Sequence, residues 1–301
     1  MSLWSRISKL VKDPPPEHVF EFSEAGIAFA HPSNGQNGAG TGFAPFEPGT
    51  LVPSPVEDNL RRPEAIASLL SQIAPPNGTK KRRPAAVILP DYAARVSVLD
   101  FVSFPSAPEE QLPLIRFRLK KTIPYDIDSA AVSYFVQPCK NGQKRPGQKI
   151  EVVAVTVALE IVARYEALLR GANFHPGEVT TSALAALNLY RVPEQSGEVV
   201  IFAKLAGRAL SLMVLAGDSV KLFRCVDLEG AGEAEILSVL QPTFAYVEDE
   251  LGTPARRLVL CGFPPGALGG LNRDTEVLRS RLGSPGAFNA GLLGYLESAE
   301  N

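Results

Sequence analysis

A short turn flanked by two cations is the segment of this sequence most able to do chemistry. The stretch VVIFAKLAGRALSLMVLA, residues 199–216, predicts two strands joined by a tight turn at Gly207 and Arg208, with Lys204 just before it. Cations beside such a turn favour phosphate or another anion. Metal-assisted phosphoryl transfer also needs a carboxylate to hold the metal, and none is expected here. The residues therefore leave phosphate binding open and count against phosphoryl transfer.

Other kinds of reactive site find little support. The three histidines are isolated, and Cys139, Cys225 and Cys261 are far apart without a CxxC spacing. We therefore predict no metal site, and we expect the cysteines to be buried free thiols in a reducing compartment. A formal net charge of -2 counts against a nucleic-acid partner, because nucleic-acid binding needs a basic surface.

The elements that must position the turn follow a plan that is repeated. The chain has 301 residues, of which 45% are hydrophobic and 21% charged, enough for one large or two medium domains. Each half predicts a hairpin or meander, then a helix, then a buried strand. The predicted elements are a hairpin at 18–30, a long loop or irregular strand pair at 31–55, helix 58–73, strands 85–89 and 96–102, helix 108–123 with a strand as the alternative, strands 130–137 and 150–158, helices 161–170 and 181–190, a meander at 199–228, helix 233–251, strand 257–261 and helix 275–282.

The first residues predict a short basic amphipathic helix that stops at a run of prolines, residues 14–16. Two readings are open: the helix lies on an anionic membrane surface, or it is a terminus that packs on the body or is disordered. No predicted membrane span or secretory signal is present, so we expect a cytoplasmic protein. The membrane-contact candidates are Leu3, Trp4, Ile7, Leu10 and Val11.

The middle of the chain carries a more specific pattern. Leu89-Pro90-Asp91, then Ile123-Pro124-Tyr125, then Ser133-Tyr134-Phe135 follow one another in an order and spacing that resemble the type IV pilus assembly protein PilM family. That family is similar to the cell-division protein FtsA. The resemblance implies an α/β, actin-like (ribonuclease H-like) fold of two lobes, with an inserted FtsA-type 1C α+β subdomain and a reduced second lobe.

The resemblance also implies domain bounds. The N-terminal segment is 1–16, and the first lobe is 17–192, with the inserted subdomain at about 92–172. The second lobe is 193–301 and lacks most of the family's 2B subdomain, because only about one helix fits between the meander and Arg257.

The nucleotide motifs of the family are degraded in this chain. Residues 21–27 form a turn without the Asp or the Ser-rich arc of the first phosphate loop, and the adenosine loop reads Gly262-Phe263-Pro264. Lys204 stands where the second phosphate loop has its Asp. We expect ATP and magnesium binding to be lost and the protein not to be an enzyme, although residual ATP binding stays open. The degenerate nucleotide-site residues are Lys204, Gly207, Arg208 and Gly262.

The resemblance implies a scaffold that binds the N-terminal cytoplasmic peptide of a PilN-like bitopic inner-membrane protein. An extended peptide would lie in an apolar groove between the first lobe and the inserted subdomain. Two alternatives remain: an active actin-like ATPase or sugar-kinase relative, and a subunit of type II secretion similar to GspL. The groove candidates, for which core packing is the other explanation, are Phe117, Leu119, Ile123, Tyr125 and Tyr134.

Overall fold

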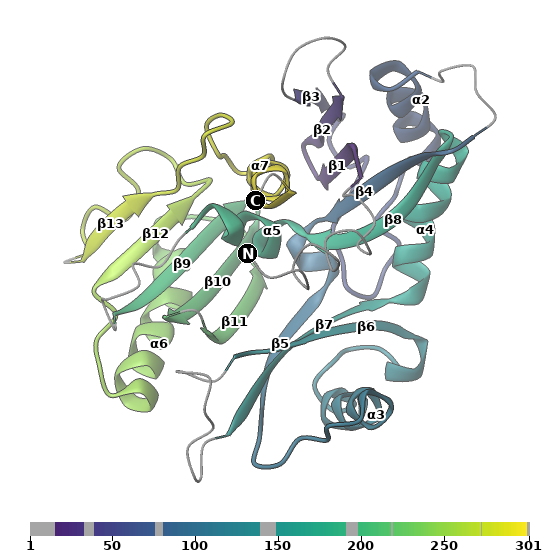
Figure 1. Cartoon of the computed structure of the whole chain (residues 1–301). Coiled ribbons are helices and arrows are strands. Elements are labelled where there is room, and N and C mark those ends of the chain that lie inside the picture. Colours follow the sequence, from purple (N-terminus) through teal and green to yellow (C-terminus); the bar gives the residue numbers. More distant parts are fainter. Residues whose placement is uncertain are drawn as a thin grey trace, which may run out of the picture.

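The computed structural model describes residues 16–32, 39–75, 81–138, 149–190, 198–217, 219–271 and 273–299. Cys139 and the predicted membrane-contact residues Leu3, Trp4, Ile7, Leu10 and Val11 lie outside these ranges. Within them, no helix combines the length and the hydropathy that crossing a bilayer requires. Figure 1 shows three sheets, each with a helix against it.

The first lobe is built on a five-stranded sheet with the order β3-β2-β1-β4-β8. Apolar side chains of two helices, α2 (Pro63–Ile73) and α4 (Leu159–Gly171), pack on one face. Both faces of the central strands are covered: β4 is an apolar run after Arg83, and every residue of β1 after His18 is buried. The strands are β1 (His18–Ser23), β2 (Gly26–Pro32), β3 (Ala39–Pro45), β4 (Arg83–Leu89) and β8 (Phe174–Thr181).

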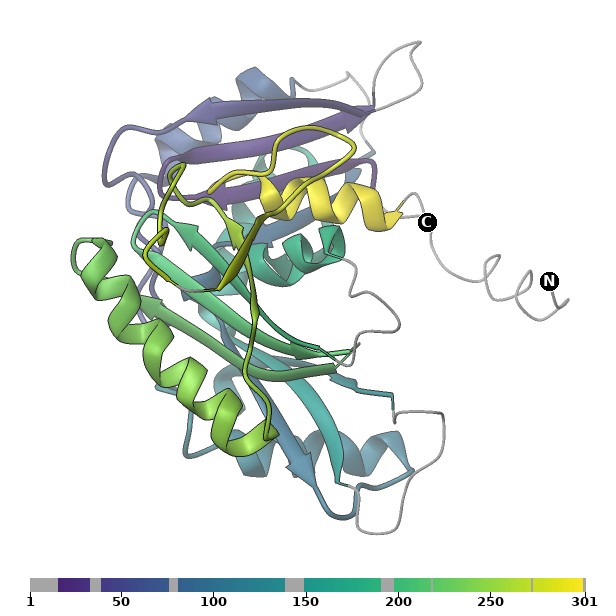
Figure 2. The ribbon, with the colours of Figure 1, turned by 90° about the vertical axis from the view of Figure 1, so that its left-hand side faces the viewer.

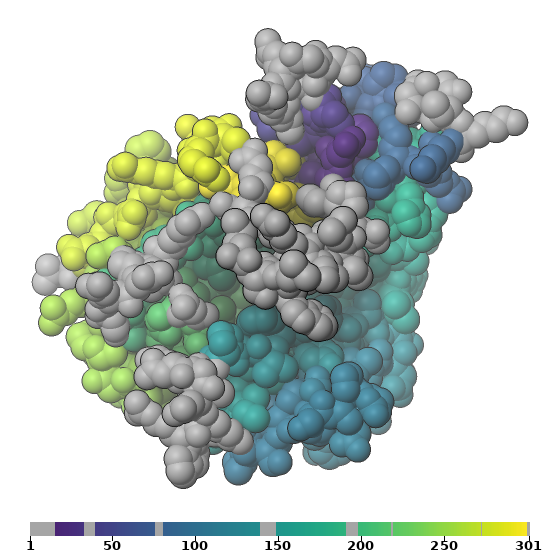
Figure 3. All heavy atoms as spheres, in the orientation of Figure 1, coloured from purple at the N-terminus to yellow at the C-terminus, as the bar shows by residue number. Residues whose placement is uncertain are grey.

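The last helix of the chain covers the other face of this first sheet. Leu292 and Tyr295 of α7 (Ala290–Ala299) pack against Val19 and Ala28. Figure 2 shows α7 lying beside the purple N-terminal strands, and Figure 3 shows yellow C-terminal residues next to purple ones on the surface. The first lobe is therefore completed by the end of the sequence.

The second lobe repeats the first sheet, with the order β11-β10-β9-β12-β13. Its outer face is covered by α6 (Glu233–Leu251), the long helix predicted from the sequence, which continues through Pro242. Its inner face packs against the short helix α5 (Ser182–Ala186) and the third sheet. The strands are β9 (Val199–Ala206), β10 (Ala209–Ala216), β11 (Ser219–Asp227), β12 (Arg257–Cys261) and β13 (Asp274–Val277).

The third sheet is antiparallel, with the order β5-β7-β6, and it is inserted between β4 and α4. One face packs against α3 (Pro108–Leu119), and the other contacts both lobes. Helix α4, which follows the insertion, packs on the first sheet. The elements are β5 (Arg95–Phe101), β6 (Ala130–Val136) and β7 (Ile150–Ala158), with single 3-10 turns η1 (Asp91–Ala93), η2 (Ile127–Ser129) and, after α5, η4 (Leu187–Leu189).

Three sequence-based expectations differ from the structure. The helix predicted at 275–282 is wrong: β13 forms there and pairs in parallel with β12, because its backbone completes the sheet edge. The helix predicted at 181–190 is α-helical only over α5. The region 31–55 contains a regular strand, β3, in which a β-carbon on Gly42 would overlap the ring of Phe29.

Candidate functional site

The two hairpin turns at the ends of β1 and β9 touch each other. Gly207 has a φ of +58°, and a β-carbon on it would overlap the carboxyl group of Glu24 in the opposite turn. Burial raises the pKa of Glu24, although the guanidinium of Arg208 acts against this. No open gap is therefore left between the two turns at this point, because the side chain of Glu24 lies against Gly207.

Arg208, a predicted phosphate contact, faces its own lobe. Its Nε donates to the carbonyl oxygen of Leu228 at 2.6 Å, and its Nη2 lies 2.7 Å from Asp227 Oδ2. The meander places both partners beside Arg208, because β11 pairs with β10 and ends at Asp227, opposite Ala209. These bonds hold Arg208 along β11.

Lys204, by contrast, points into the cleft and is buried there. Its Nζ lies 3.0 Å from Asp91 Oδ2, and both side chains are only 1% exposed. Asp91 belongs to η1 in the first lobe, so the ion pair joins the two lobes. Burial alone lowers the pKa of Lys204, but Asp91 and Glu21 outweigh it and raise that pKa above its ordinary value.

Two carboxylates that the sequence analysis did not select complete this cluster. Asp91 Oδ1 accepts from the backbone N–H of Ala183 at 2.6 Å. Glu21 accepts from the N–H of Leu292 at 2.7 Å and bonds the Ser182 hydroxyl. Burial raises the pKa of Glu21, and Lys204 partly offsets that rise. Two carboxylates of the first lobe thus lie beside Lys204, and both are engaged by the chain's own groups.

The cavity left between these residues is small. It measures about 20 Å³ and is lined by Glu21, Asp91, Ser182 and Lys204, with Pro53 and Phe288 among its walls. That is room for about one water molecule. Pockets for small organic ligands are on the order of 300–1,000 Å³. The cavity beside Lys204 is much smaller than such a pocket.

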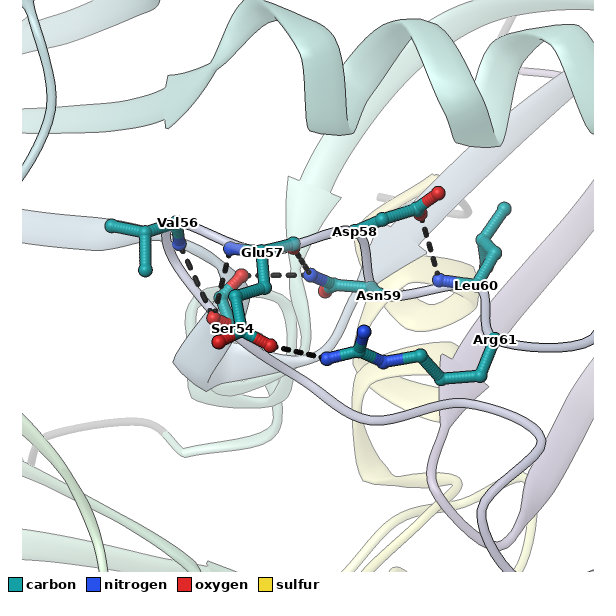
Figure 4. A network of polar contacts seen from close by, with 7 residues as sticks. All are labelled: Ser54, Val56, Glu57, Asp58, Asn59, Leu60 and Arg61. Atoms are coloured by element: carbon teal, nitrogen blue, oxygen red, sulfur yellow. Dashed lines mark hydrogen bonds and ion pairs between the residues drawn. The ribbon is translucent and has the colours of Figure 1, made fainter.

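The loop that carries Pro53 is held in place by polar contacts (Figure 4). Asn59 donates to the carbonyl oxygens of Ser54 and Glu57 at 2.7 and 2.8 Å. Its own Oδ1 accepts from the hydroxyl of Tyr165 on α4 at 3.4 Å. The wall of the cleft on this side is therefore anchored to the body of the first lobe.

Gly262, the predicted residue of the adenosine loop, is closely packed. Its φ is +76°, and a β-carbon there would overlap the carbonyl oxygen of Leu205 and lie 2.8 Å from the Cα of Ala287. The next residue, Phe263, packs against the core of the second lobe. The structure therefore gathers Lys204, Gly207 and Gly262 around one filled cleft.

The predicted groove residues occupy different environments. Leu119 is fully buried in the core of the inserted sheet, so it is not a groove wall. Ile123, Tyr125 and Tyr134 pack against that same core. Phe117 alone among the five is strongly exposed, at 75%. Packing within the subdomain accounts for most of these apolar residues.

A separate groove lies where the first lobe meets the inserted sheet. It is a cavity of about 130 Å³ between β8 and the face of β6 and β7 that points away from α3. Thr181 at its base is 2% exposed, and its hydroxyl has no hydrogen-bond partner among the described residues. Sequence reasoning placed a groove at this junction but not its residues. They are Leu89, Ser133, Val155, Val157, Val179, Thr180, Thr181 and Leu184.

The described residues contain no group of three or more His, Cys, Asp or Glu side chains that could hold a metal ion. No known family profile matches the sequence, and no curated protein is similar to it.

Solved structures do share this fold. The "PilM-PilN type IV pilus biogenesis complex" has a TM-score of 0.73 and 17% identity, over 96% of this chain and 100% of that one. The cytoplasmic domain of EpsL, an inner membrane component of the type II secretion system of Vibrio cholerae, has a TM-score of 0.51 and 16% identity, over 94% and 93%. A Bacteroides thetaiotaomicron protein with an actin-like ATPase fold and unknown function has a TM-score of 0.55 and 11% identity, over 99% of each chain.

These likenesses confirm the predicted fold. The chain has the actin-like fold, in the form seen in PilM.

Proposed function

We propose that this protein is a non-catalytic scaffold of the type IV pilus inner-membrane platform, and that it binds the cytoplasmic tail of a PilN-like bitopic protein. The observation that carries the proposal is the apolar groove between β8 and the inserted sheet. The fold it shares with a PilM–PilN complex supports the same choice of partner. The likeness to EpsL, with its lower TM-score of 0.51, makes a type II secretion partner the alternative.

The groove has the chemistry that an extended tail needs. A cavity of about 130 Å³ is close to the roughly 150 Å³ that accepts benzene in a protein core, so it suits one aromatic or branched side chain. The hydroxyl of Thr181 adds one polar group in an apolar setting. Because β8 is the outermost strand of its sheet, an extended peptide can use main-chain hydrogen bonds along it.

The absence of ATP turnover is the second part of the proposal. It is supported by the contact between the turns and by the cavity of about 20 Å³ beside Lys204. Thermal unfolding with and without millimolar Mg-ATP tests it. A ligand at about 100 times its Kd stabilises a protein by about 2.7 kcal/mol, which shifts the melting temperature measurably. We expect no shift, and a shift of several degrees would support the alternative of an active ATPase.

Tail binding is tested with a peptide that spans the N-terminal cytoplasmic residues of a PilN-like protein. Val179→Asp puts a charge into the groove and is expected to weaken peptide binding by about tenfold or more in calorimetry. Val277→Asp is the matched control, because Val277 is an exposed valine on β13, the outermost strand of the equivalent sheet. Equal affinity of the Val179→Asp variant and the wild type would contradict the proposal, as would co-purification with a partner that lacks its tail.

A further inference from the structure

The ion pair in the cleft connects the two lobes. Lys204 comes from β9 in the second lobe, and Asp91 comes from η1 in the first. Their side chains are 1% exposed, so water screens the pair very little. Lys204 is therefore a single buried cation that reaches from one lobe to the anionic groups of the other.

The carboxylates that receive Lys204 are fixed by their own lobe. The N–H of Ala183, at the start of α5, donates to Asp91. The N–H of Leu292, in α7, donates to Glu21. These bonds orient two acceptors toward the second lobe before Lys204 arrives, so little side-chain freedom is lost when the pair forms.

Lys204 is held from its own side by the sheet. In the register of the sheet, Lys204 is paired with Ser211 of β10 on one side and with Cys261 of β12 on the other. With both sides fixed, a change in the angle between the lobes would separate Nζ from Asp91 and leave charges buried without partners, which is strongly unfavourable. The pair thus favours one lobe angle over all others.

Two-lobed proteins commonly close when a ligand bridges their cleft. We propose that Lys204 bridges the cleft in place of a ligand. Its ammonium group, paired with Asp91, holds the two lobes closed without any bound ligand. Two further contacts between the same bodies act in the same direction. The side-chain amide of Gln137 bonds both the N–H and the carbonyl of Val220 on β11, at 2.7 and 2.8 Å. Lys221 pairs with Glu151 of the inserted sheet.

Hydrogen exchange and small-angle X-ray scattering of the full chain test this inference without any partner or tail peptide. Lys204→Met is expected to speed amide exchange in both facing turns, residues 20–27 and 203–209, by on the order of tenfold. The radius of gyration should rise as well. Lys149→Met is the control, because it removes an exposed lysine that pairs with Asp100 of the inserted sheet. In this variant both turns should exchange at the wild-type rate.

A Lys204→Met protein with native circular dichroism, wild-type exchange in both turns and an unchanged radius of gyration would overturn the inference. Should that variant not fold, Asp91→Asn removes the same attraction while keeping shape, and it is judged by the same two measurements. Calorimetry of the wild type adds an independent test. Coupled lobes should unfold in one transition, and two separate transitions would overturn the inference.

Discussion

Glu21 and Lys204 occupy equivalent positions in the two halves of the chain. Each lies two residues before the end of the strand that leads into its hairpin turn. Each pairs with the next parallel strand at matching positions, Ile88 and Cys261. One repeated position therefore carries an acidic residue in the first lobe and a basic residue in the second, and both side chains line the same cavity as Asp91.

Removing Lys204 alone should destabilise the protein more than removing both Lys204 and Asp91. Lys204→Met leaves buried carboxylates uncompensated, and we expect the free energy of unfolding to fall by about 3 kcal/mol. The double variant Lys204→Met/Asp91→Leu removes both charges and should recover at least about 1 kcal/mol of that loss. Urea unfolding of the two single variants and the double variant measures the coupling. Strictly additive losses would show that the two groups do not interact.

Acid should destabilise the protein through His18, which begins β1 and does not line the cavity in the cleft. Burial, Arg83 and His31 lower the pKa of His18 to about 4, against about 6.5 in the unfolded chain. The unfolded state therefore binds a proton first as the pH falls, and stability drops from about pH 6.5 towards pH 4. Because His18 is half-buried, we expect a contribution of about 1 kcal/mol after allowing for solvent screening.

Urea unfolding at pH 7 and pH 5 measures this slope. His18→Asn should flatten it, whereas the exposed His175 provides a control variant, His175→Asn, that should keep the wild-type slope. An unchanged slope in His18→Asn would assign the acid sensitivity to other groups.

The contact between the turns can be measured with two glycines of the same backbone conformation. Gly207 and Gly217 have φ values of +58° and +61°, but only Gly207 lies against another turn. Gly217→Ala should cost about 1 kcal/mol from backbone strain alone. Gly207→Ala should cost about 1 kcal/mol more, because Glu24 must move. Chemical denaturation of both variants gives the difference, and equal losses would mean that the turns do not press on each other.

A substitution of Thr181 should affect the stability of the protein and its affinity for the tail peptide in different ways. Its buried hydroxyl lacks a partner among the described residues, so Thr181→Val should leave stability unchanged or raise it by about 1 kcal/mol. The same change should weaken binding of the PilN-like tail peptide by roughly fivefold, if the tail supplies the missing hydrogen bond. Thermal unfolding and calorimetry are made on the same sample. A loss of stability would show that the hydroxyl has a partner in the free protein.

Local sequence patterns predicted most of the elements, because period and turn residues act over a few positions. Paired apolar strands around Gly207 predicted the meander, and helical spacing predicted α6. The same reasoning failed at β13, where pairing with β12 determines the structure of a segment that has helical spacing.

The cluster in the cleft was beyond the reach of such patterns. Asp91 and Lys204 are 113 positions apart, and Glu21 and Leu292 are 271 apart. Neither the spacing nor the local composition of one sequence indicates such partners. Asp91 did stand out within the family-like stretch, but nothing in its neighbourhood identified a lysine in the other half as its counterion.

The position of α7 has a consequence for how the protein is made. The helix that covers one face of the first sheet is synthesised after all the other described helices and strands. A nascent chain that does not yet include α7 thus exposes the apolar side of β1 and β4, although these strands left the exit tunnel earlier. The first lobe cannot close until α7 has left the ribosome, and a chaperone that shields this surface until then would protect newly made molecules from aggregation.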